Sequence, residues 1–205
     1  MRVLVIGGTG TIGRAVVEAL KAHELVLASR RSSPLRVDIR DEASIEAMYQ
    51  SAGRLDAVVS VAGDVAFAPL ERLTSADFQE SLGNMLMGQV NVVRLGVPFV
   101  SNGGSFTVTA GSLSREPMPG GAAISLVTGA LEAFVRAAAL EMPRGLRVNA
   151  VSPPWIRESL IAHGMDPSLG IPAEESARSY VESLSGSFSG VVLTPGVTER
   201  HEAHR

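Results

Sequence analysis

Cysteine is absent from this sequence of 205 residues, and aromatic residues make up only 4% of it. The absence of cysteine excludes disulfides, thiolate metal ligands and cysteine nucleophiles. The histidines, including His163, His201 and His204, show no spacing with carboxylates that indicates another kind of metal site, so we expect no metal. A chain of this length buries roughly 70% of its unfolded surface and can fold without a metal or disulfide.

A strong charge of either sign and long apolar runs are also missing. The formal net charge is −3, whereas a nucleic-acid-binding surface is usually strongly basic. No apolar run reaches the roughly 18 residues that span a membrane, and Met1–Ile6 leads directly into glycines without the features of a signal peptide. We therefore expect a cytoplasmic protein with no nucleic-acid or membrane partner.

Glycine, in contrast, is abundant, with 21 residues in the chain, above the average of about 7%. Short apolar runs rich in β-branched residues predict buried parallel strands, and they alternate with segments whose apolar residues recur at helical spacing. Asp41 is expected to cap the second helix. The expected strands cover residues 3–6, 25–28, 35–39, 57–61, 105–109, 147–151 and 190–193, and the expected helices cover 14–22, 42–51, 75–97, 122–142 and 174–184.

This alternation predicts an α/β protein with a three-layer Rossmann fold, a doubly wound parallel sheet of about seven strands with helices on both faces. We expect one domain over residues 1–197, followed by a polar tail over 198–205. Ligands bind at the carboxyl ends of the strands in such sheets. The candidate segments are therefore those that follow strands, at residues 7–13, 29–31, 62–64, 110–116 and 152–158.

The first of these segments has the spacing G-x-x-G-x-x-G between a strand and a helix. Glycine permits the tight turn and the close approach of a pyrophosphate, and the helix N-terminus offers unpaired N–H groups to the anion. No Lys-Ser/Thr pair follows, which excludes a Walker-type loop, and the alternative is a plain glycine-rich turn. The predicted cofactor-binding residues of this loop are Gly7, Thr9, Gly10, Thr11, Ile12 and Gly13.

The second strand ends at Ser29-Arg30-Arg31. An acidic residue at this place would accept a hydrogen bond from the ribose of NAD, whereas an arginine suits the 2′-phosphate of NADP. NADP is therefore the expected cofactor, and NAD is less favoured. We expect Arg30 rather than Arg31 to bind the 2′-phosphate. The alternative is that both arginines are solvated surface side chains. Ser29 belongs to the same predicted site, and Asp38 is expected at the adenine edge.

An ordered set of further segments resembles the short-chain dehydrogenase/reductase family over nearly the whole chain. The set comprises the glycine loop, Val37-Asp38-Ile39, Val61-Ala62-Gly63, Gly88 before Pro98, Ala130-Leu131-Glu132-Ala133-Phe134 and Arg147-Val148-Asn149-Ala150-Val151-Ser152-Pro153. The resemblance implies a Rossmann fold, NAD(P) binding, hydride transfer to or from a carbonyl or alcohol carbon, and homodimers or homotetramers built on the two long helices. Together with the position of these segments after strands, it adds Ala62, Gly63, Thr128, Pro153, Trp155 and Ile156 to the cofactor-binding residues.

The catalytic half of the family pattern differs here. The family's Tyr-x-x-x-Lys pair falls on Ile124 and Thr128, its serine on Gly111 next to Ser112, and its asparagine on Met85 next to Asn84. Ser112 and Asn84 are thus the catalytic candidates that remain. Tyr49 and Tyr180 lie in expected helices, away from the site.

Two functions are consistent with this pattern. The first is an NADP(H)-dependent oxidoreductase that acts on a small carbonyl or alcohol substrate with atypical catalytic residues, in which Ser112 polarises the carbonyl. The second is a non-catalytic NADP(H)-binding regulatory or scaffold protein. Arg115 and Glu116 form either a substrate clamp or a surface ion pair. Trp155 packs over the nicotinamide or the substrate, or else it anchors its loop. Residues 155–172 are expected to form an irregular lid.

Overall fold

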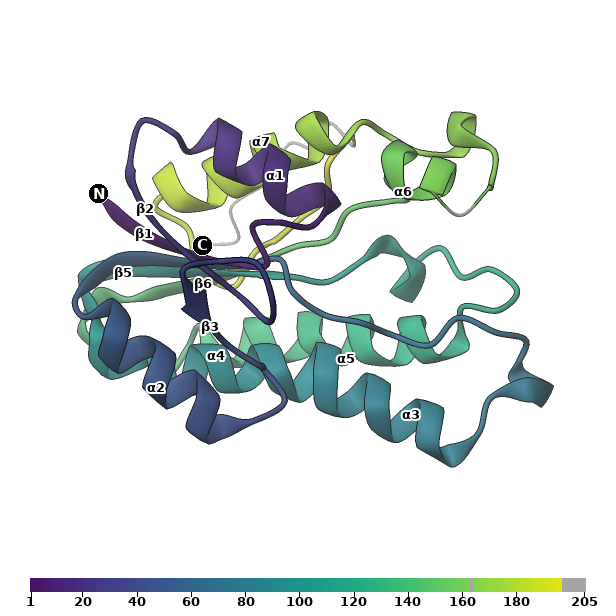
Figure 1. The fold of residues 1–205 in the computed structure, drawn as a ribbon, viewed down its shortest axis with the longest axis horizontal. Coiled ribbons are helices and arrows are strands. Elements are labelled where there is room, and N and C mark those ends of the chain that lie inside the picture. The colour runs from purple at the N-terminus through teal and green to yellow at the C-terminus, as the bar shows by residue number, and fades with distance from the viewer. Residues whose placement is uncertain (163, 197–205) are drawn as a thin grey trace.

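The computed structural model describes residues 1–162 and 164–196 and contains a seven-stranded, wholly parallel sheet (Figure 1). Its order is β3-β2-β1-β4-β5-β6-β7, so the direction of strand addition reverses between β1 and β4. This sheet confirms the α/β class and the doubly wound fold expected from the sequence. The strands are β1 (Arg2–Ile6), β2 (Glu24–Ser29), β3 (Leu35–Arg36), β4 (Leu55–Ser60), β5 (Val100–Thr109), β6 (Arg147–Val151) and β7 (Val192–Leu193).

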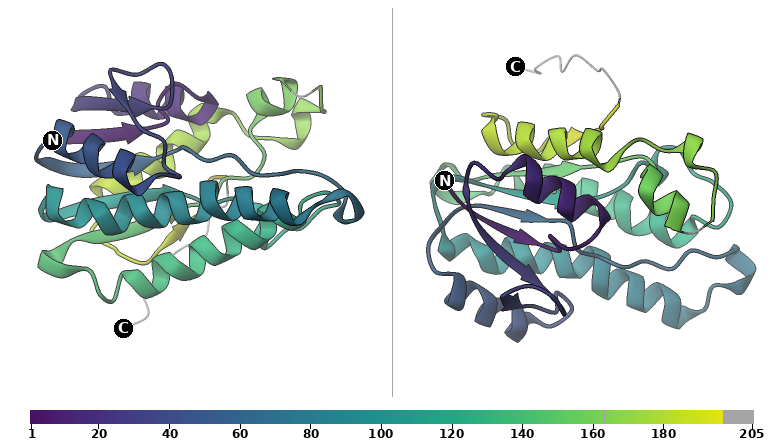
Figure 2. Two further views of the ribbon diagram at one scale, coloured as in Figure 1. Left: turned by 60° about the horizontal axis from the view of Figure 1, so that its bottom comes forward. Right: turned by 45° about the horizontal axis from the view of Figure 1, so that its top comes forward.

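Helices cover both faces of the sheet, with α1 and α7 on one face and α2, α4 and α5 on the other (Figure 1). Helix α5 lies beside α3 and the segment that follows it (Figure 2). None of the described helices is long and apolar enough to cross a membrane. The helices are α1 (Thr11–Ala19), α2 (Glu42–Ala52), α3 (Ser75–Ser81), α4 (Gly88–Gly96), α5 (Ala122–Ala138), α6 (Arg157–Ala162) and α7 (Ala173–Ser185).

Strand β1 shows why its sequence is apolar without alternation. Val3 and Val5 pack into the core beneath α1 and α7, whereas Leu4 and Ile6 pack into the core on the opposite face. A strand that is covered on both faces needs apolar side chains at every position. Asp41 caps α2 as expected, because its side chain accepts a hydrogen bond from the backbone N–H of Ala43.

The helix expected over residues 75–97 is not one regular α-helix. It consists of α3, a π-helical turn over Leu82–Met87, α4 and a final 3-10 turn over Val97–Phe99. The wider π-helical turn takes up one more residue than an α-helical turn and so shifts the buried face. Leu82 and Leu86 are half-buried, whereas Asn84 and Gln89 are buried.

The segment 155–172 contains more regular structure than an irregular lid. It includes α6 and a 3-10 turn at Pro167–Leu169. Its base is closed by two backbone hydrogen bonds, from Arg157 N to Ile171 O at 2.8 Å and from Ile171 N to Trp155 O at 2.9 Å. His163 and the expected tail over 198–205 lie outside the described residues.

Candidate cofactor-binding and active site

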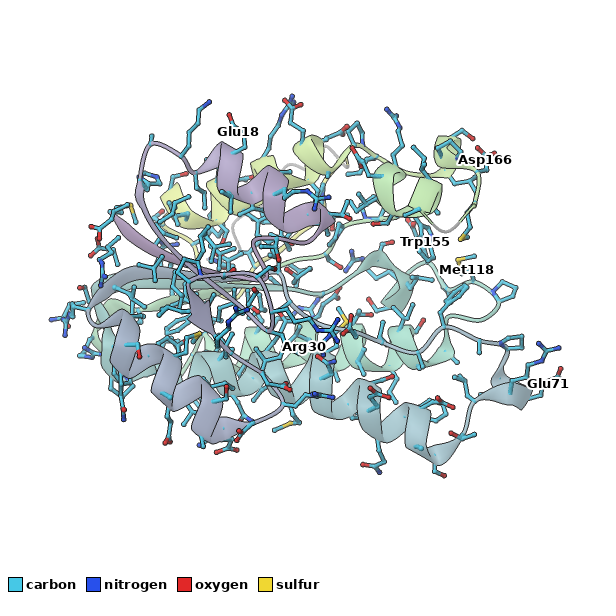
Figure 3. The ribbon with its side chains drawn as sticks, viewed as in Figure 1. Glu18, Arg30, Glu71, Met118, Trp155 and Asp166 are labelled. Carbon is cyan, nitrogen blue, oxygen red and sulfur yellow. The ribbon has the colours of Figure 1, made fainter. Side chains whose placement is uncertain are left out.

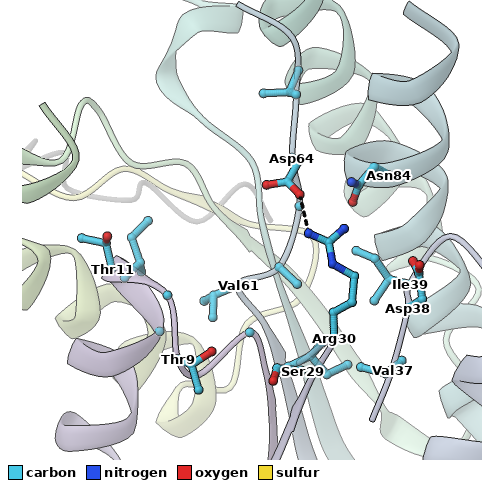
Figure 4. Close-up of a pocket in the computed structure, with 18 of the residues that line it drawn as sticks. Thr9, Thr11, Ser29, Arg30, Val37, Asp38, Ile39, Val61, Asp64 and Asn84 are labelled. Atoms are coloured by element: carbon cyan, nitrogen blue, oxygen red, sulfur yellow. Dashed lines mark hydrogen bonds and ion pairs between the residues drawn. The ribbon is translucent and has the colours of Figure 1, made fainter. Parts of the chain in front are cut away.

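A cavity of about 620 Å³, termed here the cofactor cavity, opens at the carboxyl ends of β1, β2 and β4, where the strand order reverses (Figure 4). Parallel sheets bind dinucleotides at this place. Its lining includes most residues that the sequence assigned to a cofactor, namely Gly7, Thr9, Gly10, Thr11, Ile12, Gly13, Ser29, Arg30, Asp38, Ala62 and Gly63.

The glycine loop passes directly from β1 into α1, which begins at Thr11 and not at Arg14 as expected. Gly7 has a φ of 85°, which favours glycine, and a Cβ atom on Gly13 would lie 2.1 Å from the carbonyl oxygen of Gly7. Gly10 is the N-cap, and no side chain caps the helix. The first-turn amides of α1 therefore suit a phosphate group.

Arg30 reaches into the cofactor cavity from the end of β2, and its Nη2 lies 3.3 Å from Oδ2 of Asp64 (Figure 4). Both side chains are well exposed, and an ion pair of this kind is weak. An incoming phosphate can thus replace Asp64 as the partner of Arg30 at little cost. Arg31 is exposed and does not belong to the lining.

Asp38 is held by the neighbouring Arg40. The Arg40 guanidinium donates from Nε to Oδ1 at 2.9 Å and from Nη2 to Oδ2 at 2.6 Å. These hydrogen bonds lower the pKa of Asp38 to about 2, against the opposing effect of partial burial. Asp38 is therefore a carboxylate at neutral pH, positioned at the edge of the cofactor cavity.

A second cavity, of about 250 Å³ and termed the inner cavity, lies beside the first and shares Ile12, Ala62, Gly63 and Ser159 with it, among others. The ends of β5 and β6 contribute most of its remaining lining. The described lining contains no ionisable side chain. The residues are Ile12, Val61, Ala62, Gly63, Val65, Met85, Thr109, Ala110, Gly111, Leu113, Ile124, Pro153, Pro154, Trp155, Ile156 and Ser159.

The two catalytic candidates are placed differently. Asn84, in the π-helical turn, lines the cofactor cavity, and among the described residues its side-chain amide has no hydrogen-bond partner. Ser112 is buried in a 3-10 turn, where its N–H donates to the carbonyl of Pro153 at 3.0 Å, and it lines neither cavity. Thr128 also lies outside both linings, and its hydroxyl donates back to the carbonyl of Ile124 within α5.

The tyrosine hydroxyls are both buried. The Tyr49 hydroxyl donates to Val92 O at 2.6 Å, and the Tyr180 hydroxyl pairs with Oγ1 of Thr109 at 2.7 Å. Burial raises the pKa of both tyrosines. Tyr180 is nearer to the site than its place in the sequence indicates, since Thr109 belongs to the inner cavity, but the phenol itself is closed off from it.

Sequence reasoning missed a buried cluster behind the inner cavity. Arg115 pairs with Glu132 of α5 and not with its neighbour Glu116. Glu132, almost fully buried, also accepts hydrogen bonds from Ser152 Oγ at 2.8 Å and Ser114 Oγ at 3.2 Å. It was visible in the sequence only as part of the family pattern. Ser159, which lines both cavities, was missed because α6 was not expected.

Comparison with known proteins identifies the family. A family model described as Enoyl-(Acyl carrier protein) reductase matches residues 11–182. The chain is a member of the short-chain dehydrogenase/reductase family. This membership accounts for the glycine loop before α1 and for the position of both cavities at the carboxyl edge of the sheet.

Several of the similar curated proteins are reductases or oxidoreductases by name. A hydroxynaphthalene reductase of Aspergillus fumigatus is 28% identical over 83% of this chain, and versicolorin reductase 1 of Dothistroma septosporum is 31% identical over 73% of it. An uncharacterised NAD-dependent oxidoreductase of Mycobacterium tuberculosis is 33% identical over 72% of the chain. The matches span 65%, 59% and 55% of the lengths of these three relatives, respectively.

Solved structures match over more of their length. The protein lin1944 from Listeria innocua has a TM-score of 0.91 and 38% identity, with 95% of this chain and 98% of that chain covered. A small-chain dehydrogenase has a TM-score of 0.82 and 25% identity, with 95% of each chain covered. Short members of this fold with almost the same length are therefore known.

Proposed function

We propose that this protein is an NADP(H)-dependent oxidoreductase that acts on a small carbonyl or alcohol substrate. The observation that carries the proposal is the position of Arg30. Its side chain projects from the end of β2 into the cofactor cavity, which the glycine loop also lines. An arginine at this place suits the 2′-phosphate that distinguishes NADP from NAD.

The names of similar proteins do not agree on whether the cofactor is NAD or NADP. The mycobacterial relative is named NAD-dependent, whereas a solved small-chain dehydrogenase of the same fold, 23% identical, is in complex with NADPH. The proposed preference for NADP over NAD therefore rests on the residues of this chain. No acidic side chain occupies the end of β2, where Ser29-Arg30-Arg31 stands, and an acidic residue there would suit the ribose hydroxyl of NAD.

The residues of the cofactor cavity fit a dinucleotide. The close approach of Gly7 and Gly13 and the uncapped start of α1 suit the pyrophosphate, and Arg30 suits the 2′-phosphate. We assign Asp38 to the contact with the edge of the adenine ring. When bound, the nicotinamide supplies or accepts the hydride. We assign the reacting carbon of the substrate to the inner cavity, whose lining is mostly apolar.

The proton of the reaction is assigned to water, because the described lining of the inner cavity contains no ionisable side chain. Reduction adds a hydride to the carbonyl carbon and a proton to its oxygen. We assign the holding of that water to the side-chain amide of Asn84, which lines the cofactor cavity and has no hydrogen-bond partner among the described residues. Ser112 lines neither cavity, so we rank Asn84 above it.

A second candidate function, an NADP(H)-binding protein without turnover, is favoured by one observation. Ile124 lines the inner cavity where the family resemblance expects the catalytic tyrosine, and Thr128 stands in place of the lysine. Such a protein would keep the cofactor cavity and use it for regulation or as a scaffold.

Two measurements distinguish these functions. Fluorescence titration tests whether NADPH binds, and a panel of ketones and aldehydes then tests whether NADPH is consumed. Turnover that falls more in Asn84→Ala than in Ser112→Ala supports the enzyme as described. Tight binding of NADPH without turnover across the panel favours the second function, and failure to bind either NADPH or NADH contradicts both.

We further propose a cytoplasmic homodimer or homotetramer built on α4 and α5, as family membership suggests. Met87, just before α4, and Leu126 of α5 are about half exposed, which suits a contact between copies. Light scattering during size-exclusion chromatography tests this, with a monomer as the contradicting result.

A further inference from the structure

We propose that the substrate is an uncharged, largely apolar ketone or alcohol whose apolar body extends from the inner cavity into a second chamber. This chamber, termed the outer cavity, has a volume of about 640 Å³. The inference rests on the proposed function, because the inner cavity is assigned to the reacting carbon. It adds a binding subsite and a substrate class to that function.

The outer cavity lies between two loops that follow β4 and β5. Its lining is Phe67, Pro69, Leu70, Pro117, Met118, Pro119, Gly120, Gly121, Ala122 and Ser125. The N–H of Ala68 donates to the carbonyl of Gly120 at 3.2 Å and so joins the two loops. The cavity is therefore built by a fixed contact between segments some fifty residues apart in the sequence.

A wall of three side chains separates the outer cavity from the inner one. The rings of Phe67 and Trp155 meet edge to face, with centroids 5.8 Å apart and planes at 85°. The indole Nε1–H of Trp155 donates to Sδ of Met118 at 3.2 Å, and the two side chains lie together in Figure 3. Trp155 lines the inner cavity, whereas Phe67 and Met118 line the outer one, so the wall belongs to both.

The outer cavity adjoins the inner cavity across this wall, and that adjacency points to the substrate as its occupant. The inner cavity alone, at about 250 Å³, is smaller than the roughly 300–1,000 Å³ of typical ligand pockets. It holds the reacting carbonyl and a small group. We assign the apolar body of a larger substrate to the outer cavity, on the other side of the wall of Phe67, Met118 and Trp155.

The charge and polarity of both linings define the substrate class. Neither described lining contains an ionisable side chain. The hydroxyl of Ser125 already donates to Leu113 O at 2.7 Å, and that of Thr109 to Ser60 O at 2.7 Å. An anionic substrate would lose its hydration without gaining a partner, whereas an apolar one gains buried contact area.

The experiment uses Prodan, an uncharged naphthyl ketone whose emission shifts to the blue in apolar surroundings. Prodan is titrated into the full-length protein with and without saturating NADPH, and competitors are then added. We expect acetylnaphthalene to displace it and the carboxylated analogue, acetylnaphthoate, to compete at least tenfold more weakly. Equal competition by the two compounds would overturn the assignment of an uncharged substrate.

A matched pair of variants locates the binding site. Leu70 and Leu169 are 68% and 66% exposed, and each lies in a 3-10 turn, but only Leu70 lines the outer cavity. Leu70→Asp should weaken Prodan binding about tenfold or more, since it places a carboxylate beside the apolar ligand. Leu169→Asp should leave Prodan binding unchanged, and both variants should bind NADPH like the wild type.

The outcomes separate this inference from the proposed function. Normal NADPH binding with no Prodan binding, or equal effects of the two aspartates, overturns the subsite and leaves the NADP(H) proposal standing. Failure of the wild-type protein to bind NADPH contradicts the proposed function itself. If Leu70→Asp changes the oligomeric mass and not the Prodan affinity, the outer cavity is a contact between copies of the chain and the inference fails.

Discussion

Ile124 is the residue at which the proposed chemistry departs most from the family pattern. It lines the inner cavity, and no ionisable group in the described lining takes over the role of a phenol. A positioned general acid typically contributes 10²–10⁴-fold to a proton-transfer step. A slow, water-dependent reduction is therefore expected from the wild type.

Ile124→Tyr should raise the rate of NADPH consumption with a reactive ketone by about tenfold or more, because it returns a proton donor to the cavity wall. Ile124→Phe is the matched control, since it adds the same ring without the hydroxyl. Steady-state kinetics of both variants make the comparison. Equal rates for the two variants would show that a phenol at this position cannot reach the reacting oxygen.

Asp38 links pH to the stability of the cofactor cavity. Its pKa is lowered to about 2 by the hydrogen bonds from Arg40, from an ordinary value of 3.8. A lowered pKa in the folded state stabilises the protein above the ordinary value, and this contribution disappears as the pH falls toward about 2. Both side chains are about a third exposed or more, so the effect is about 1 kcal/mol or less.

Asp38→Asn should therefore unfold at a lower urea concentration than the wild type at neutral pH. The difference in the free energy of unfolding should shrink between about pH 4 and pH 2, where the wild-type carboxylate takes up its proton. Urea titrations followed by circular dichroism, without cofactor, provide the measurement. A difference that stays constant over this pH range would refute the assigned ion pair.

Single residues also show how far sequence reasoning reaches. Arg30 was assigned from its place directly after a strand, and the structure puts it in the cofactor cavity. Its contact with Asp64 joins residues 34 positions apart, and no local pattern encodes it. The roles assigned to all these residues stay predictions, and Ser112, Thr128 and Arg31 lie outside the two linings.

Among the elements, the run from α3 to α4 explains the position of Asn84. Aligning the family pattern by counting residues places the asparagine on Met85, next to Asn84. The π-helical turn over Leu82–Met87 takes up one residue more than an α-helical turn, and Asn84 within it lines the cofactor cavity. Apolar spacing alone does not reveal such a turn, because it depends on contacts with neighbouring elements.

The cluster around Glu132 ties α5 to the ends of β5 and β6. Its buried carboxylate accepts from Ser114 and Ser152 and pairs with Arg115. Loss of one partner in a buried charge network typically costs about 3–5 kcal/mol, but Arg115 is partly exposed and can be hydrated when it loses its partner. Glu132→Ala should therefore lower the free energy of unfolding by about 2–3 kcal/mol.

Glu116→Ala serves as the control for this prediction, because Glu116 is exposed and follows Arg115 directly in the sequence. Its effect should stay within about 0.5 kcal/mol. Equilibrium unfolding in urea gives both values. A comparable loss in the two variants would mean that the buried cluster does not hold the loop after β5 in place.

At the scale of the whole molecule, the three cavities run along the carboxyl edge of one parallel sheet. The cofactor cavity and the inner cavity share residues, and the inner and outer cavities share the wall of Phe67, Met118 and Trp155. The order of strands and helices was predictable because apolar runs and helical spacing are local signals. The outer cavity was not, because it forms where two distant loops meet.

The titration of NADPH and NADH against the wild type, Arg30→Asp and Arg31→Asp tests the central claim most directly. Arg31 is the matched control, since it neighbours Arg30 but lies outside the lining of the cofactor cavity. The wild type should bind NADPH more tightly than NADH. Arg30→Asp should weaken NADPH about tenfold or more while sparing NADH, and Arg31→Asp should have a smaller effect. Equal losses for both cofactors in Arg30→Asp, or a wild type that prefers NADH, would contradict the account.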